Sequence, residues 1–164
     1  MRRSAEPTVD ERDLQLIKSL EDDGRKPWRQ IAAELDVSEA TVYLRVKRLV
    51  EEGVLKGFTV RVDPSKLGLG ATAYVLLRVR ADSSTKVKEA IKTLPYVVEA
   101  HETTGPHNFL LKVLAPTQRE VSRVLEDLAS LPGILEVISI LSLGEFKSQS
   151  SLADVYSFWT NRGR

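Results

Sequence analysis

The sequence predicts an α+β protein with two small domains: an N-terminal helical domain and a C-terminal ferredoxin-like β-α-β-β-α-β domain. Two patterns support this prediction. Apolar residues recur every three or four positions through residues 10–53, which is typical of helices packed on one another. From residue 71 to residue 144, apolar strands alternate with two helical segments. A chain of 164 residues is long enough to give each domain its own core.

The composition narrows the class of protein. Charged residues make up 29% and hydrophobic residues 42% of the chain, as in ordinary folded proteins. The sequence has no cysteine, which excludes disulfides, thiolate metal sites and cysteine nucleophiles. It also has no apolar stretch near the ~20 residues that span a bilayer, and residues 1–10 contain no apolar run of a signal peptide. We therefore expect a cytoplasmic protein that does not bind membranes.

Three helices are expected between residues 10 and 53, after a polar, flexible arm at residues 1–9. Asp10 is a good N-cap, and Asp13 adds a carboxylate in the first turn, where the helix dipole favours it. Gly24 ends this helix, and Pro27 suits the first turn of the next. The inner face of the second helix is apolar, and a short turn follows it; these residues are Ile31, Ala32 and Leu35, then Asp36-Val37.

The third helix begins at the N-cap Ser38 and ends at Gly53. At ~100° per residue, one side is apolar and faces the other two helices: Val42, Val46, Leu49 and Val50. The opposite side carries small and cationic residues, and small residues at the helix start allow close approach to base edges. Residues 10–54 are therefore interpreted as a winged-type helix-turn-helix domain that binds double-stranded DNA. The predicted DNA-binding residues are Ser38, Glu39, Ala40, Thr41, Tyr43, Leu44, Arg45, Lys47 and Arg48.

Several roles on this helix stay open from the sequence. The net charge of +1 gives no general affinity for DNA, so binding must depend on where the cations lie. Lys47 and Arg48 suit phosphate contact better than base readout. Arg45 either contacts DNA or braces the fold against an acid on the first helix. Glu39 either accepts from cytosine or favours the helix dipole. Trp28 is expected to serve packing.

The linker and the second domain follow. Residues 54–62 predict two short extended pieces around Gly57, in which Val60 and Val62 alternate with polar residues, so 55–70 is taken as a strand linker. The second domain, 71–144, has strands and helices in the order of a ferredoxin-like fold with both helices on one face. Its strands are expected at 71–80, 97–104, 108–115 and 134–143, and its helices at 83–94 and 117–131.

The strands of this second domain are apolar on both sides. Val75-Leu76-Leu77 and Phe109-Leu110-Leu111 are apolar in succession, although a sheet with helices on one side should leave a polar open face. We expect Tyr74, Leu76 and Val113, or their neighbours, to be covered by a second subunit, with two sheets packed face to face in a homodimer.

Residues 145–164 form a C-terminal extension that ends in a possible helix. Leu152, Val155, Tyr156 and Trp159 are spaced as one helical face. Two alternatives stay open: the helix docks on its own domain, or it grips a neighbouring dimer.

The sequence resembles the Lrp/AsnC (leucine-responsive, feast/famine) family of transcriptional regulators. The resemblance covers about residues 10–144. It rests on the following motifs: Asp10…Asp13, Asp23-Gly24-Arg25, Ile31-Ala32, Val37-Ser38-X-X-Thr41-Val42-X-X-Arg45-Val46-X-X-Leu49, Gly53-Val54-Leu55-X-Gly57-Phe58, Thr104-Gly105 and Leu131-Pro132-Gly133. It implies a sequence-specific regulator with a RAM-type regulatory domain, which dimerises and assembles into octamers.

The resemblance also implies an amino-acid or other small-metabolite effector, bound between dimers near the turn after the second regulatory strand. Carried onto this chain, the effector-binding residues are Thr103, Thr104, Gly105, Pro106, His107, Asn108, Pro132 and Gly133. The chain departs from the family here. Pro106 and Asn108 stand where the family usually has two aspartates, and this removes both carboxylates that would pair with the ammonium of an amino acid.

Other functions were weighed against the regulator. His101 and His107 lack the partners and the spacing of a metal site, so no metal and no cofactor are predicted. The resemblance extends to sirohaem-type decarboxylases of haem biosynthesis, which would need arginines for the substrate carboxylates and a histidine acid. Residues 71–144 show no arginine-rich motif, so no catalytic residue is assigned and the protein is not expected to be an enzyme. An architectural DNA-wrapping protein is equally compatible with an octamer.

Overall fold

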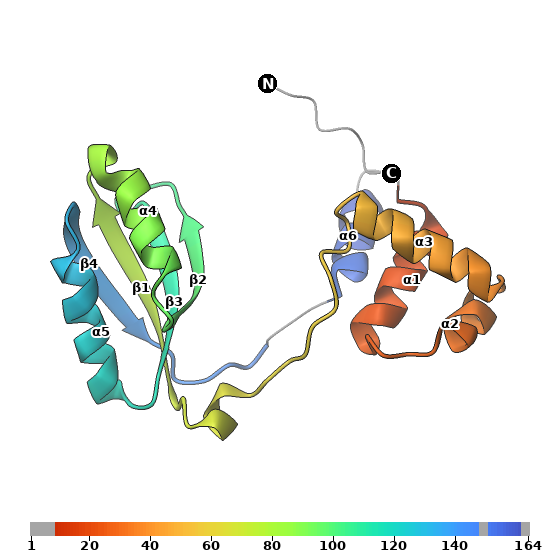
Figure 1. Cartoon of the computed structure of the whole chain (residues 1–164), viewed down its shortest axis with the longest axis horizontal. Helices are drawn as coiled ribbons and strands as arrows, with labels where there is room; N and C mark the ends of the chain where they lie inside the picture. The colour runs from red at the N-terminus through yellow and green to blue at the C-terminus, as the bar shows by residue number, and fades with distance from the viewer. Residues whose placement is uncertain (1–8, 148–150, 162–164) are drawn as a thin grey trace. The chain divides into compact units, whose positions relative to one another are not determined.

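The computed structural model describes residues 9–147 and 151–161; most of the predicted flexible arm lies outside the described residues. The chain forms two compact units (Figure 1). One contains the N-terminal part to Arg61 together with the C-terminal segment from Lys147, and the other is Val62–Phe146. Most of the predicted extension, 145–164, therefore groups with the helical unit. Among the described residues, no helix is long and apolar enough to cross a membrane.

The first unit contains the three predicted helices: α1 (Glu11–Asp22), α2 (Trp28–Leu35) and α3 (Glu39–Glu51). Asp10 caps α1 in a reciprocal box with Asp13, as the sequence predicts. Asp36 ends α2 in the left-handed conformation, with φ of 51°. The core between the helices is apolar and fully buried at Leu16, Ile31, Val42 and Leu49. The prediction that Val50 faces the other helices is wrong. Val50 is 44% exposed, because it lies at the edge of the apolar side of α3 that Val42, Val46 and Leu49 form.

A fourth helix, α6 (Leu152–Asn161), packs against α1 in the same unit. Lys18 on α1 forms an ion pair with Asp154 at 2.7 Å. Glu21 accepts hydrogen bonds from the Leu152 backbone N–H and the Ser151 hydroxyl, so a carboxylate from α1 caps the start of α6. Ala153 is the buried residue of α6, whereas the four residues of the predicted helical face are exposed: Leu152, Val155, Tyr156 and Trp159. The alternative in which this face grips a neighbouring dimer stays a prediction.

The predicted strand linker is wrong for the described chain. Residues 54–63 form no strand, and a 3-10 helix follows at Pro64–Leu67. Val60 and Val62 are exposed, 79% and 57% respectively. The alternation of the sequence is present, but a strand needs a neighbouring strand to take up its backbone hydrogen bonds, and the described chain provides none here.

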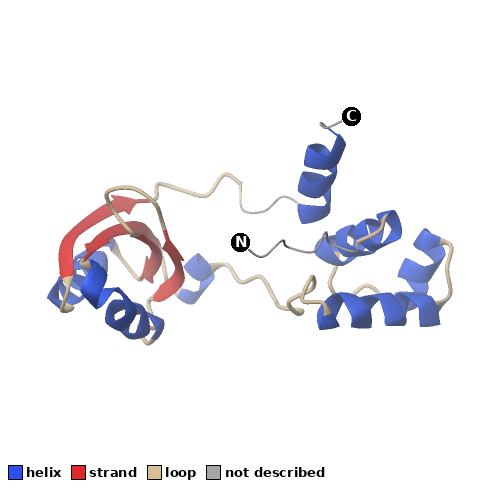
Figure 2. Ribbon diagram, turned by 90° about the horizontal axis from the view of Figure 1, so that it is seen from above, coloured by secondary structure: helices blue, strands red, loops and turns tan. Residues whose placement is uncertain are grey.

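The second unit has the predicted β-α-β-β-α-β order. Its elements are β1 (Ala71–Val79), α4 (Ser84–Lys92), β2 (Val97–Glu102), β3 (Phe109–Ala115), α5 (Gln118–Ser130) and β4 (Ile134–Leu141). The sheet order is β2-β3-β1-β4, and each neighbouring pair is antiparallel. Both helices cover the same side of this sheet, as Figure 2 shows. The ferredoxin-like prediction is confirmed.

The two sides of the sheet differ in what covers them. The helix-facing side is the core, where Val75, Leu77 and Leu111 are fully buried. The register places Tyr74 opposite Ile140 and Leu76 opposite Ile138, all on the open side. Tyr74, Ile138 and Ile140 are exposed. The open face was thus predicted correctly for Tyr74 and Leu76 but wrongly for Val113, which is buried on the helix side opposite Ala73.

Gly133, a predicted effector residue, has a structural role in the turn before β4. Its φ is 98°, and a Cβ at this position would lie 2.2 Å from Cβ of Ser83. Its carbonyl accepts a hydrogen bond from Arg80 N–H. The turn before β4 therefore passes too close to Ser83 for any other residue, and this explains Gly133 without a ligand.

Candidate nucleic-acid interface and effector region

The outer side of α3 is open to solvent. Most of the predicted DNA-binding residues are exposed on it: Ser38, Glu39, Ala40, Tyr43, Leu44 and Lys47. Thr41 is half-buried. The outward orientation follows from Val42, Val46 and Leu49, which fix the opposite side of α3 in the core. This gives the exposed recognition helix that a helix-turn-helix needs to enter a major groove.

Hydroxyl groups fix the start of α3. Ser38 Oγ accepts from Thr41 N–H at 3.1 Å, which confirms the predicted N-cap, and it lies 2.9 Å from Thr41 Oγ1. Glu39 stands in the first turn, where a carboxylate interacts favourably with the helix dipole. The first turn of α3 is therefore ordered before any ligand is bound.

Two of the predicted DNA-binding cations turn toward α1. Arg45 Nη1 lies 2.7 Å from Asp13 Oδ1 and 2.8 Å from Asp10 Oδ2. Arg48 Nη2 pairs with the other oxygen of Asp13. Asp13 is fully buried, so its charge is compensated by both guanidinium groups. For Arg45, the bracing alternative is the one observed, and Arg48 shares it.

The same contacts set the protonation of the cluster. Partial burial opposes ionisation of Asp10, but hydrogen bonds from Arg45 and from Asp13 N–H outweigh it and lower the pKa of this carboxyl. Hydrogen bonds to Asp10 and Asp13 raise the pKa of Arg45, and the bond to Asp13 raises the pKa of Arg48. These shifts favour the charged forms of Asp10, Arg45 and Arg48.

An aromatic pair lies on the same outer surface and was missed by the sequence analysis. The ring centroids of Trp28, the first residue of α2, and Tyr43 lie 5.3 Å apart, with their planes at 39°. Both side chains are exposed, 39% and 47% respectively. The two residues are far apart in the sequence, so periodicity did not predict the contact. The available signal was Pro27, which marks the start of the helix that precedes the recognition helix.

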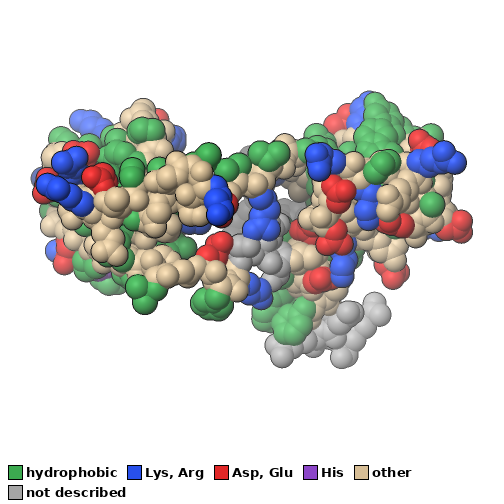
Figure 3. Space-filling model, turned by 90° about the horizontal axis from the view of Figure 1, so that it is seen from below, with side chains coloured by type: hydrophobic (Ala, Val, Ile, Leu, Met, Phe, Trp, Pro, Cys, Tyr) green, Lys and Arg blue, Asp and Glu red, His purple; other side chains and the backbone are tan. Residues whose placement is uncertain are grey.

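Charge on the surface is mixed rather than concentrated. In the view of Figure 3, basic and acidic side chains are interspersed over both units. This agrees with the net charge of +1. Attraction to DNA must therefore come from local groups such as Lys47, which is exposed on α3 with Glu51 at 3.8 Å.

The predicted effector turn between β2 and β3 is held by its own hydrogen bonds. Thr103 Oγ1 donates to the His107 carbonyl at 2.8 Å, and Thr103 N–H donates to the Asn108 carbonyl. The Asn108 amide accepts from Val79 N–H at 2.8 Å and donates to the Val79 carbonyl at 3.1 Å. Asn108 therefore bridges to the irregular end of β1, whereas Thr104, Gly105, Pro106 and Pro132 are exposed.

A charged group lies beside this turn. His107 Nε2 is 3.2 Å from Glu136 Oε2 on β4, and Arg78 Nε donates to the same oxygen at 3.1 Å. Arg78 and Glu136 are paired across the β1–β4 register. The turn lacks the family's two aspartates, but Glu136 supplies a carboxylate next to it, together with two groups that can hold an anion.

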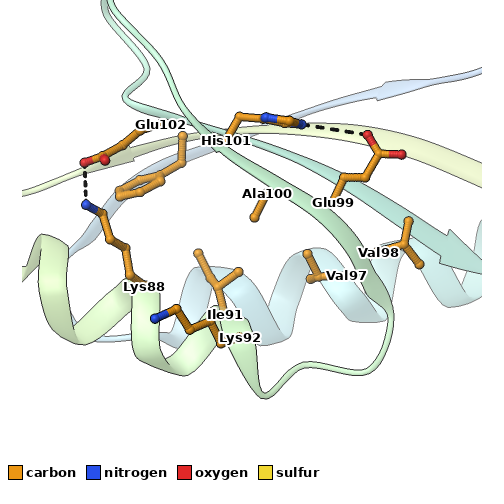
Figure 4. A pocket seen from close by; sticks show the side chains of 10 residues that line it. Lys88, Ile91, Lys92, Val97, Val98, Glu99, Ala100, His101 and Glu102 are labelled. Carbon is orange, nitrogen blue, oxygen red and sulfur yellow. Dashed lines mark ion pairs between the residues drawn. The ribbon is translucent and has the colours of Figure 1, made fainter. Parts of the chain in front are cut away.

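A hollow with a volume of about 380 Å³ lies elsewhere in this unit, between α4 and β2 (Figure 4). Val97 and Ala100 point from β2 toward α4. At the rim, Lys88 pairs with Glu102 at 2.6 Å. None of the predicted effector residues lines this hollow.

Each of the two histidines lies beside a carboxylate. His101 lies 3.8 Å from Glu99, and His107 contacts Glu136. Within residues 9–147 and 151–161, no group of three His, Cys, Asp or Glu side chains is placed to hold a metal ion.

A helix-turn-helix with an outward recognition helix, joined to a ferredoxin-like unit, defines a DNA-binding protein with a separate regulatory domain. Residues 9–56 match the family model for winged helix-turn-helix DNA-binding, and residues 72–152 match that for the Lrp/AsnC ligand binding domain.

Relatives cover most of the chain. The HTH-type transcriptional regulator FL11 of Pyrococcus horikoshii is 32% identical over 88% of this chain and 95% of its own length. LrpA of the same organism is 29% identical over 85% of this chain and 99% of its own length. Among solved structures, B. subtilis LrpC is similar with a TM-score of 0.79 and 26% identity, covering 86% of this chain and 99% of that one.

Two further structures share the fold. E. coli AsnC has a TM-score of 0.82 at 21% identity, over 87% of this chain and 97% of that one. A regulator of Neisseria meningitidis, solved as a complex with L-Met, has a TM-score of 0.82 at 23% identity, over 88% and 96%. The chain belongs to the Lrp/AsnC family of DNA-binding transcriptional regulators. The relatives named here are regulators, so the decarboxylase alternative gains no support from them.

Replacing Asp13 by Asn should destabilise the first unit by about 3 kcal/mol, because Arg45 and Arg48 lose their shared counter-charge. Urea unfolding followed by tryptophan fluorescence measures this, since Trp28 and Trp159 both lie in this unit. Asp22→Asn, at an exposed position of the same helix, is the matched control. Equal unfolding free energies for the two variants would show that the cluster is dispensable.

Proposed function

We propose that the protein binds DNA with the outer side of α3 in the major groove. The observation that carries this is the exposure of the first turns of α3 together with the burial of its valines. In this proposal the residues that face DNA are Ser38, Glu39, Ala40, Thr41, Tyr43, Leu44 and Lys47. Arg45 and Arg48 hold α3 at the correct angle through Asp13 and contribute charge from its flank. Phosphate contacts then make affinity fall with salt.

Lys47→Ala should weaken binding to all duplexes and reduce the slope of log K against log salt by about 1. The free energy of unfolding should be unchanged in Lys47→Ala, whereas Arg48→Ala should lower it. The measurement is a gel-shift titration on promoter DNA of the protein's own gene over a range of salt concentrations. Lys86→Ala, an exposed lysine on α4, is the control for net charge. A wild-type slope for Lys47→Ala would exclude Lys47 from the interface.

We further propose that the open side of the sheet forms a homodimer interface. Tyr74, Leu76, Ile138 and Ile140 supply a continuous apolar surface there, and such a surface is rarely left uncovered in a monomer. A two-fold dimer would present two recognition helices to half-sites about 34 Å apart. Assembly into octamers and a cytoplasmic location stay predictions. Footprint length separates a switch at one operator from an architectural wrapper, which protects an extended, periodic stretch of DNA.

Ile138→Lys should shift the protein toward monomer, because dimerisation would bury a charge in the centre of this surface. Sedimentation velocity at micromolar concentration measures the change. Ser139→Lys is the matched control, since Ser139 is exposed on the same strand and lies opposite the buried Val75, on the helix side of the sheet. Identical sedimentation of both variants would place the interface elsewhere.

For the effector, we propose a small zwitterion bound at the turn, with the residues Thr103, Thr104, Gly105, Pro106, His107, Asn108, Pro132 and Gly133 around it. Glu136 supplies the carboxylate for an ammonium, and Arg78 or His107 suits a carboxylate. Asn108 and Gly133 act as framework, because their contacts are made within the fold. The exposure of Thr104 and Pro106 supports completion of the site by a second dimer.

A thermal-shift screen of the twenty amino acids should identify one that raises the melting temperature, because a ligand stabilises the folded state that binds it. Glu136→Gln should remove this shift. Ala100→Leu, which fills the hollow between α4 and β2, should retain it. Loss of the shift in Ala100→Leu, with the shift retained in Glu136→Gln, would indicate that the ligand binds in that hollow. The absence of any shift in the wild-type protein would argue against an amino-acid effector.

A further inference from the structure

Apolar side chains are exposed in the first two turns of α3, next to the polar Ser38 and Glu39. Arg45 and Arg48, two of the three basic residues of α3, pair with Asp13, and Lys47 lies a turn further along the helix. After the exposed Ser38 and Glu39, the next exposed side chains along α3 are Ala40, Tyr43 and Leu44. Trp28 joins them from α2. A surface built to read guanine would present a free arginine fork here instead.

Trp28 limits the freedom of Tyr43. Pro27 precedes Trp28 and fixes the backbone at the start of α2, and the indole lies against the phenol ring at 5.3 Å. Such a pair contributes beyond simple burial and restricts the side-chain rotamers of both residues. Each of the two residues nevertheless keeps more than a third of its surface exposed, so the pair leaves area available to a ligand. Ala40, one turn before Tyr43, leaves room for that ligand.

We propose that the Trp28–Tyr43 pair reads the C5-methyl group of thymine in the major groove, with Trp28 as the positioning residue. This inference rests on the proposed docking of α3 in DNA. Thymine is the one DNA base with a methyl group on its major-groove edge, and apolar contact is how proteins recognise it. The protein then prefers thymine at the base pair that the Trp28–Tyr43 pair contacts in each half-site. Apolar contact sets this preference, rather than a cation.

The test compares thymine with deoxyuracil, which lacks only this methyl group. A duplex selected from a random pool by the wild-type protein is re-synthesised with each thymine replaced in turn by deoxyuracil. Wild-type affinity should fall about fourfold at one position in each half-site, the loss expected for one buried methyl group. Trp28→Ala and Tyr43→Ala should bind thymine and uracil duplexes equally. Tyr43→Phe and Trp28→Phe, which keep an aromatic ring, should retain discrimination and serve as folding controls.

Fluorescence gives an independent readout. The chain has two tryptophans, so Trp159→Phe leaves Trp28 as the reporter. Its emission should change on binding the thymine duplex and change less on binding the uracil duplex. A different result is that Trp28→Ala and Tyr43→Ala bind DNA with the wild-type ratio of affinities for the thymine and uracil duplexes. That result overturns this inference but not the proposed function. If no duplex is retarded at any salt concentration, the proposed function itself fails.

Discussion

The helical unit depends on the buried charge of Asp13. A fully buried carboxylate is costly unless its charge is compensated, and here both oxygens are paired, one with Arg45 and the other with Arg48. The same residue closes the capping box at the start of α1. One side chain therefore fixes the start of the first helix and the angle of the third. The position of the outer side of α3 follows from this cluster.

That cluster changes how the DNA-facing surface is understood. Cations on a recognition helix are usually expected to contact DNA, but two of the three on α3, Arg45 and Arg48, form ion pairs with Asp13. On the outward face, Lys47 is the exposed cation of α3, and the Trp28–Tyr43 pair adds apolar surface beside Ser38 and Glu39. The two proposals thus assign general affinity to Lys47 and sequence preference to the aromatic pair.

The second unit shows the same division between framework and function. Asn108 and Gly133 make contacts with the backbone near the end of β1, whereas Glu136, Arg78 and His107 lie together beside the turn. The apolar open face of the sheet is the surface that we propose binds a second copy of the chain. α6 adds a helix to the DNA-binding unit, and most of it lies beyond the region matched by the family's ligand-binding domain.

The sequence by itself determined the element order, the caps at Asp10 and Ser38 and the buried side of α3, because these follow from periodicity and local hydrogen bonds. Tertiary structure decided which groups meet across long separations: Asp13 with Arg45 and Arg48, Trp28 with Tyr43, and α6 with α1. It also corrected Val50, Val113 and the linker strands. Local patterns specify helices and alternation, but the partner of a charge, a ring or a strand edge is set by packing between distant segments.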